Sequence, residues 1–222
     1  MESGPLKVET VVSTPFSENA FVIYLSHSSD CVVIDPGLEP EKIIAYLDAQ
    51  HLNLVAILLT HGHSDHIGGV DALMQRSSEC DLVIGENEVS KLTDPMENLS
   101  PMFGFDLIAP AASVTVADGD TYSAAGIEFE VREIPGHTTG HVVFLIKDRV
   151  PMLGFVGDVI FSGSIGRTDF PGGSMEALVH GIHNKLFTLP DDTLLYSGHG
   201  PVTTVGQEKR SNPFVGQDRR GF

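Results

Sequence analysis

Three histidines and one aspartate lie close together directly after the apolar run of residues 54–59: His61, His63, Asp65 and His66. Zinc and iron take neutral imidazole nitrogen and carboxylate oxygen as ligands. A metal site that carries out chemistry also keeps a coordination position open for water or substrate. The density of ligand-type residues therefore predicts metal-dependent chemistry.

The order of these residues divides them into two pairs. The apolar run is typical of a buried strand, and side chains one residue apart beyond its end leave the chain on the same side, which groups His61 with His63. Ser64 is typical of a helix N-cap, so Asp65 and His66 are expected on the following helix, pointing in another direction. One loop could serve two neighbouring metal positions.

Further ligand-type residues follow other strand-like runs, and each stands directly after a glycine: His137, Asp158 and His199. An isolated histidine is more often an ordinary hydrogen-bonded polar residue than a ligand, but the repeated context favours a metal site. Strand ends on one edge of a sheet are where the sites of layered α/β folds are assembled, and glycine permits close backbone approach. We therefore expect these side chains to meet the first four.

These motifs, in this order, resemble the metallo-β-lactamase superfamily over about residues 11–205. Within it, the segments 135–141, 157–161 and 211–214 resemble glyoxalase II and related thioester hydrolases of the hydroxyacylglutathione hydrolase type. The resemblance implies a four-layer αββα sandwich and two divalent metal ions, zinc and/or iron. It implies that one ion is held by His61, His63 and His137, the other by Asp65, His66 and His199, and that Asp158 bridges them.

Such a pair of ions supports hydrolysis. Two ions about 3.5 Å apart lower the pKa of a bridging water towards about 7 and polarise a carbonyl oxygen, so a metal-bound hydroxide can attack a thioester. The thiolate leaves without a strong acid because a thiol has a pKa near 8.5. Asp65 is the predicted catalytic residue, because it can both ligate and orient the nucleophile. Cys31 and Cys80 lie in apolar surroundings and are expected in the core.

The chain also departs from glyoxalase II. That family has a helical domain after the last histidine ligand, whose basic residues hold glutathione, whereas here residues 1–222 are predicted to form a single metallo-β-lactamase-like domain without it. Arg167 stands where glyoxalase II has a lysine and is the predicted substrate-binding residue, with Lys209 or Arg210 as further candidates. Asp169 stands where the family has a tyrosine.

Two other activities remain open. The string from Gly166 to Phe170 also resembles the persulfide dioxygenases of the superfamily, which are mononuclear iron enzymes; their ligands would be His61, His137 and Asp158. The third possibility is another superfamily hydrolase acting on lactones or β-lactams, or a protein that uses the metal only structurally. Retention of the remaining ligand-type residues favours the two-metal hydrolase.

Asp35 and His141 each allow two interpretations. Asp35 ends an apolar strand that points to the same edge, and it either supports a metal-ligating histidine or caps a turn. His141 lies four residues after His137, and a structural role at a strand start is favoured over a role in orienting a ligand.

The composition limits the partners. A formal net charge of −17 disfavours nucleic-acid binding, which requires basic patches. The chain has no apolar run near 18 residues and no recognisable leader, so we expect a cytoplasmic protein that does not enter the membrane and acts on a small-molecule thioester. The oligomeric state is left open.

The elements that must position the site alternate in type. Periodicity predicts a loop or lid at 93–110, helices at 39–50, 65–75, 87–92 and 174–187, and strands at 7–12, 19–25, 31–34, 55–59, 82–84, 113–116, 127–133, 142–146, 152–156 and 193–196. Strands followed by helices in each half favour two stacked sheets with helices outside.

Overall fold

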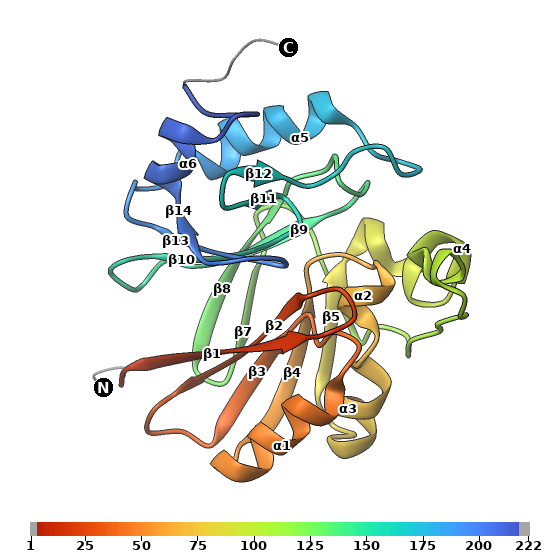
Figure 1. Ribbon diagram of the computed structural model, residues 1–222. Helices are drawn as coiled ribbons and strands as arrows, with labels where there is room; N and C mark the ends of the chain where they lie inside the picture. Colours follow the sequence, from red (N-terminus) through yellow and green to blue (C-terminus); the bar gives the residue numbers. More distant parts are fainter. Residues whose placement is uncertain (1–3, 218–222) are drawn as a thin grey trace.

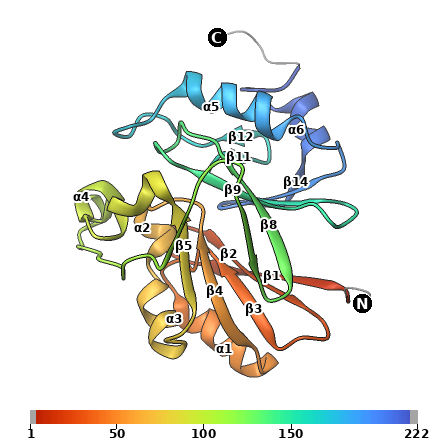
Figure 2. The ribbon, with the colours of Figure 1, turned by 180° about the vertical axis from the view of Figure 1, so that it is seen from behind.

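The computed structural model describes residues 4–217 and confirms the four-layer αββα sandwich. Two six-stranded sheets face each other, and helices cover the outer face of each (Figure 1). The view from behind shows α1 and α3 below the first sheet and α5 and α6 above the second (Figure 2). Each half of the chain therefore contributes one sheet and its covering helices.

The first sheet has the order β1-β2-β3-β4-β5-β6. β1 to β3 are antiparallel, whereas β3 to β6 run parallel, so the last residues of the parallel strands reach the same edge. The buried apolar runs predicted from the sequence form its centre. The strands are β1 (Leu6–Ser13), β2 (Glu18–Leu25), β3 (Asp30–Ile34), β4 (Asn53–Leu59), β5 (Asp81–Gly85) and β6 (Val114–Val116).

The second sheet has the order β14-β13-β10-β9-β8-β7, and β11 pairs with β12 in a separate hairpin. β7, β11, β12 and β14 were not predicted; each has only two to four residues, which gives a weak periodic signal. The strands are β7 (Thr121–Ala124), β8 (Ile127–Glu133), β9 (Val142–Ile146), β10 (Leu153–Gly157), β11 (Ile160–Phe161), β12 (Ser164–Ile165), β13 (Leu194–Ser197) and β14 (Thr203–Thr204).

The helix expected over 65–75 is interrupted, so that prediction was wrong. The chain forms α2 (Ser64–Ile67) and α3 (Val70–Arg76), separated by two glycines. A Cβ at Gly69 would lie 2.9 Å from the carbonyl oxygen of Pro36, so this part of the chain packs closely against the loop after β3. The N-cap of α2 is His63 and not Ser64, whose hydroxyl lies within the first turn without a hydrogen-bond partner.

The other helices cover the sheets much as predicted. α1 (Pro40–Gln50) and the 3₁₀ helix η1 (Glu86–Leu92) belong to the first half. In the second half, α5 (Met175–Gly181) begins at Ser174, whose hydroxyl accepts a hydrogen bond from the Ala177 amide, and continues as the π-helical turn η3 (Ile182–Leu186). The last helix, α6 (Val205–Ser211), was not predicted.

Apolar side chains fill the spaces between the layers. Phe21, Leu58 and Phe144 belong to the cluster between the two sheets, and each is at most 2% exposed. Burial of one such side chain stabilises the fold by about 1.5–3 kcal/mol. Cys31 and Cys80 lie in the cluster under α1 and α3, which confirms their expected core position, and burial raises the pKa of Cys31 to about 12. The sandwich thus provides a rigid edge for the loops.

The segment from residue 93 to 108, here called the cap segment, contains the short helices α4 (Pro95–Asn98) and η2 (Ser100–Phe103). Asn98 is fully buried, and its amide nitrogen donates to the carbonyl oxygens of Lys91 and Leu107, at 3.0 and 2.9 Å. The two ends of the cap segment are thereby joined. In the described part of the chain, no helix has the length and apolar character needed to cross a membrane.

Candidate metal centre

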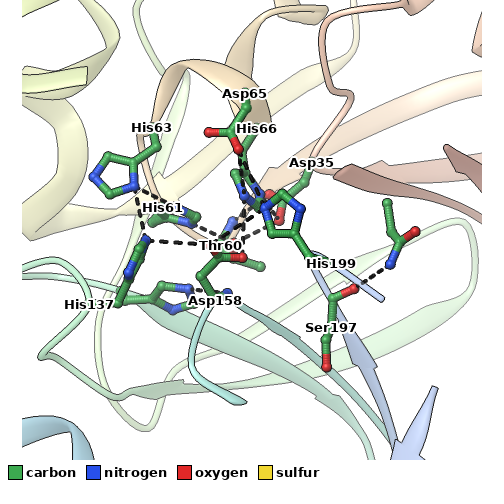
Figure 3. A network of polar contacts seen from close by, with 12 residues as sticks. Asp35, Thr60, His61, His63, Asp65, His66, His137, Asp158, Ser197 and His199 are labelled. Atoms are coloured by element: carbon green, nitrogen blue, oxygen red, sulfur yellow. Dashed lines mark hydrogen bonds and ion pairs between the residues drawn. The ribbon is translucent and has the colours of Figure 1, made fainter. Parts of the chain in front are cut away.

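The ligand-type residues come from four loops that follow strands and meet at one edge of the two sheets (Figure 3). The segment after β4, which includes the short helix α2, supplies four of them. The loops after β8, β10 and β13 supply His137, Asp158 and His199 respectively. All the residues predicted as ligands therefore lie in one site.

The first group consists only of imidazoles: His61, His63 and His137. His63 Nδ1 lies 3.1 Å from His61 Nε2 and 3.0 Å from His137 Nε2. Burial and neighbouring imidazoles lower the pKa of His61 well below its usual value; burial and His137 lower that of His63 to about 3. Both rings are therefore neutral at pH 7, the form in which imidazole binds metals.

The second group combines a carboxylate with two imidazoles: Asp65, His66 and His199. Asp65 Oδ2 lies 3.4 Å from His199 Nε2 and 3.9 Å from His66 Nε2. Burial acts to lower the pKa of His66, but the surrounding carboxylates outweigh it and raise that pKa well above its usual value. This group is therefore electrostatically unlike the first.

Asp158 lies between the two groups. Its Oδ2 is 3.6 Å from both His137 Nε2 and His199 Nε2, and its Oδ1 is 3.4 Å from His66 Nε2. Burial acts to raise the pKa of this carboxyl, but the imidazoles around it prevail and lower it. An ionised carboxylate with an oxygen towards each group can contact ions in both.

The residues fit divalent metal ions. His66 Nε2 and Asp158 Oδ1 are buried 3.4 Å from each other and form no hydrogen bond, and a buried polar atom without one is costly. Within each group, the ligand atoms lie within 4.8 Å of one another. Imidazole nitrogen and carboxylate oxygen are ligands of zinc and iron. A divalent ion in the second group would bind both of these atoms, and the first group offers a second ion three imidazole nitrogens.

The family profile of the Metallo-beta-lactamase superfamily matches residues 13–199, which include the whole candidate centre. The chain belongs to the metallo-β-lactamase superfamily. Among curated superfamily members, it is 39% identical to the hydroxyacylglutathione hydrolase GloC of Haemophilus influenzae, over 95% of this chain and 98% of that protein. It is also 39% identical to the probable metallo-hydrolase YqgX of Bacillus subtilis, over 90% of this chain and 93% of that protein.

Solved structures of the superfamily show the same fold. The BLEG-1 B3 metallo-beta-lactamase is 36% identical, with a TM-score of 0.89 over 94% of this chain and 99% of that one. The di-iron-bound form of TTHA1623 is 35% identical, with a TM-score of 0.81 over 93% of this chain and 100% of that one. ETHE1 from Myxococcus xanthus is 29% identical, with a TM-score of 0.77 over 93% of this chain and 83% of that one.

In this superfamily member, Asp35 supports a histidine of the second group, as one of the two sequence interpretations proposed. Its Oδ2 contacts His66 Nδ1 at 3.0 Å and accepts a hydrogen bond from the Thr60 hydroxyl at 2.7 Å, while its Oδ1 accepts from the Thr60 amide at 2.8 Å. The imidazole is thereby oriented with its other nitrogen towards the ligands. Loss of such a contact to a metal-binding histidine typically lowers the metal affinity by about 10–100-fold.

His141 also belongs to the site, although the sequence favoured a structural role at a strand start. Its Nε2 accepts a hydrogen bond from the Asp158 amide at 3.0 Å, and its ring stacks on His61 with a centroid distance of 4.7 Å. The side chain is fully buried. It therefore fixes the backbone of Asp158 and one face of a first-group imidazole.

The structure adds a buried ion pair that sequence reasoning missed. Glu88 is fully buried and its Oε1 lies 3.0 Å from Lys91 Nζ. The same carboxylate accepts hydrogen bonds from the amides of Gly62 and Gly140, both at 2.9 Å. It therefore joins the loops that carry His63 and His137. A Glu and a Lys three residues apart also match an exposed helical pair, so the sequence offered no signal.

Asn19 was missed as well. Its side-chain amide donates to the carbonyl oxygens of Ser197 and Gly200, at 2.9 and 2.8 Å, and so holds the loop of His199. Gly198 in that loop has no room for a side chain, because a Cβ would lie 2.4 Å from Asp158 Oδ1. The close approach of this loop to the Asp158 carboxylate requires glycine here.

Of the residues predicted to bind substrate, Arg167 lies at the cavity over the site, whereas Lys209 and Arg210 do not. Arg167 lines the cavity over the site, but its Nε and a terminal guanidinium nitrogen bind Asp169 at 2.7 and 2.8 Å. Its carbonyl oxygen lies 2.9 Å from His137 Nδ1. Lys209 binds Asp191 at 2.7 Å, and neither it nor Arg210 lines the cavity, so their role in holding glutathione stays a prediction that this geometry does not support.

Proposed function

We propose that this protein is a metal-dependent hydrolase that cleaves a thioester such as an acylglutathione. The observation that carries the proposal is the position of Asp158, whose two oxygens lie between an all-imidazole group and a carboxylate-containing group. The relative named hydroxyacylglutathione hydrolase GloC supports the thioester as the bond that is cleaved.

In the proposed centre, the first group would hold one zinc or iron ion, the second group would hold another, and Asp158 would be available to both. When bound, such a pair of ions lowers the pKa of water and polarises a carbonyl oxygen. Asp65 faces the cavity, and its carboxylate is expected to accept a hydrogen bond from the nucleophilic water and orient it. The leaving thiolate needs no acid, because a thiol has a pKa near 8.5.

The proposal also includes the substrate, the extent of the domain and the location of the protein. Arg167 is proposed as a substrate-binding residue at the cavity wall, and the substrate as a small-molecule thioester. We further propose that residues 1–222 act as one metallo-β-lactamase-like domain. The cytoplasmic location stays a prediction.

Metal analysis combined with a thiol-release assay tests the proposal. Protein purified without added metal should contain zinc or iron and release thiol from an acylglutathione; a chelator should abolish the release, and added metal should restore it. The same preparation is tested for oxygen uptake on glutathione persulfide and for cleavage of a β-lactam. Oxygen uptake without thiol release, or a structure with one ion held only by His61, His137 and Asp158, would refute the two-metal thioesterase.

A further inference from the structure

The cavity above the metal centre has largely apolar walls. It has a volume of about 430 Å³, and the ligand side chains form only part of its lining. Its apolar lining comes from separate segments of the chain: the β1–β2 turn, the cap segment, the β11–β12 hairpin and the loop after β12. The residues concerned are Phe16, Leu99, Phe103, Phe161, Ile165 and Phe170.

These walls reach the ligands of both groups. Phe170 meets His63 edge-on with a centroid distance of 5.8 Å, and Phe161 meets His199 at 5.9 Å. At the mouth, Phe16 and Phe103 contact each other at 4.7 Å, and Phe103 remains 47% exposed. An apolar group bound between these rings would therefore lie directly beside the reacting carbonyl.

Outside the proposed metal ligands, the described wall of the cavity offers no unpaired lysine or arginine to an anionic group. Among the described residues that line it, Arg167 is the one lysine or arginine, and its guanidinium is neutralised by Asp169 and stacks 3.8 Å above the Phe170 ring. Asp65 and Asp158 are proposed metal ligands, so bound ions would offset their negative charge, and their carboxylates offer an anionic group no hydrogen-bond donor. The wall offers apolar surface in place of an unpaired cation.

We infer that the cavity selects its substrate by an apolar acyl group, aliphatic or aromatic, and not by the carboxylates of the thiol part. The inference rests on the proposed thioester hydrolysis and adds the class of acyl group. Each methylene buried between the aromatic rings should improve binding in the transition state by up to about fourfold. A hydroxyl on an acyl group that lies against these six apolar residues should weaken binding, because their side chains offer it no hydrogen-bond partner.

A series of glutathione thioesters with a constant thiol tests this inference. We expect kcat/KM to rise at least about tenfold from the acetyl to the hexanoyl thioester, and to be lower for the lactoyl than for the propanoyl thioester. A flat series, or a preference for lactoyl, would overturn the inference and leave the hydrolase intact. If the metal-loaded protein cleaves no member, both the inference and the proposed function fail.

Binding without turnover gives a second readout. By calorimetry, the thioether S-hexylglutathione should bind the metal-loaded protein at least about tenfold more tightly than S-methylglutathione. Equal affinities would count against an acyl-binding wall, whatever the catalytic result.

Variants identify the wall. Phe103→Ala should lower kcat/KM for the hexanoyl thioester about tenfold and for the acetyl thioester less than about threefold, and Phe16→Ala should act alike. Both residues are only partly buried, so we expect the variants to fold. The matched control is Met96→Ala in the same cap segment, which is 73% exposed and does not line the cavity; it should behave as wild type. Equal losses for both substrates would overturn the assignment.

Discussion

The two ligand groups of this centre differ in charge and in access. The first group contains only buried imidazoles, whereas in the second group His199 and Asp65 have side chains that are 27% and 17% exposed. Burial keeps His61 and His63 neutral, while carboxylates raise the pKa of His66. We therefore expect a metal ion to bind the neutral imidazoles of the first group without displacing protons. Binding to the second group should release protons, because a protonated imidazole must lose its proton before it can bind a metal.

The groups are also supported differently. Glu88 joins two ligand loops of the first group through backbone amides, so it acts on the position of whole loops. Asp35 contacts the ring of His66 itself. Substitution of Glu88 should therefore lower the stability of the fold. Substitution of Asp35 should lower the affinity for the metal of the second group. Five substitutions, ordered by expected effect, test this contrast.

Asp158→Ala should give the largest effect, because its carboxylate is shared by both groups. We expect metal content to fall at both positions and thioester hydrolysis to be abolished, with any residual rate lower by more than about a hundredfold. Metal analysis and thiol release measure this. Asp192→Ala, at an exposed aspartate, is the control and should keep full activity. Near wild-type turnover of Asp158→Ala would contradict the bridging role.

Glu88→Gln should lower the free energy of unfolding by about 3 kcal/mol, because Lys91 remains buried without its counter-charge. Urea unfolding measures the change. Glu128→Gln, at an exposed glutamate, should change the free energy by less than about 0.5 kcal/mol. If the two variants are equally stable, Glu88 does not hold the loops.

His199→Ala should weaken the second position and leave metal in the first. Hydrolysis should fall by about a hundredfold, since one of the two ions is lost. Metal stoichiometry, measured by titration, should drop towards one ion. The control is His180→Ala, an exposed histidine on α5. Loss of both ions in His199→Ala would show that the two groups do not bind independently.

Asp35→Asn tests the support of the second group without removing a ligand. Asp35 has a φ of 48°, a conformation that asparagine tolerates, so we expect the fold to remain. The affinity of the second metal should fall about 10–100-fold, while the first metal stays bound. Asp48→Asn, which loses only an exposed ion pair with Arg76, is the control. An equal loss of affinity at both positions would remove the contrast between the supports.

Arg167→Ala should have the smallest effect. Because Asp169 already neutralises the guanidinium, KM for an acylglutathione should rise only about two- to threefold, with kcat little changed. Asp169→Asn frees the guanidinium and should lower KM for the same substrate. An unchanged KM in both folded, metal-loaded variants would remove Arg167 from the substrate site.

The sequence predicted those parts of the site that depend on local pattern. The apolar run ending at Leu59 and the closely spaced ligands after it are both local signals, and the strands β2 to β5 and β8 to β10 were found for the same reason. The break at Gly68 and Gly69 was missed, because it depends on packing against a loop about thirty residues earlier in the chain.

The supporting residues escaped prediction for a related reason. Glu88 lies 52 residues from Gly140 in the sequence, and Asn19 lies 178 residues from Ser197, yet each pair is joined by a hydrogen bond. No periodicity links such partners, and the residue type alone does not tell whether a polar side chain is buried or exposed. Only the tertiary arrangement distinguishes them.

The closure of the cap segment has a consequence for how new specificity could arise. Asn98 joins the two ends of this segment, and the Ala109 amide donates to the carbonyl oxygen of Leu92 at 2.7 Å. A loop whose ends meet can gain or lose residues at a modest entropic cost, because that cost grows only slowly with loop length. Insertions between Ser100 and Asp106 should therefore reshape the cavity mouth while leaving the metal ligands in place. Grafting this segment between relatives offers a route to exchange their substrate ranges.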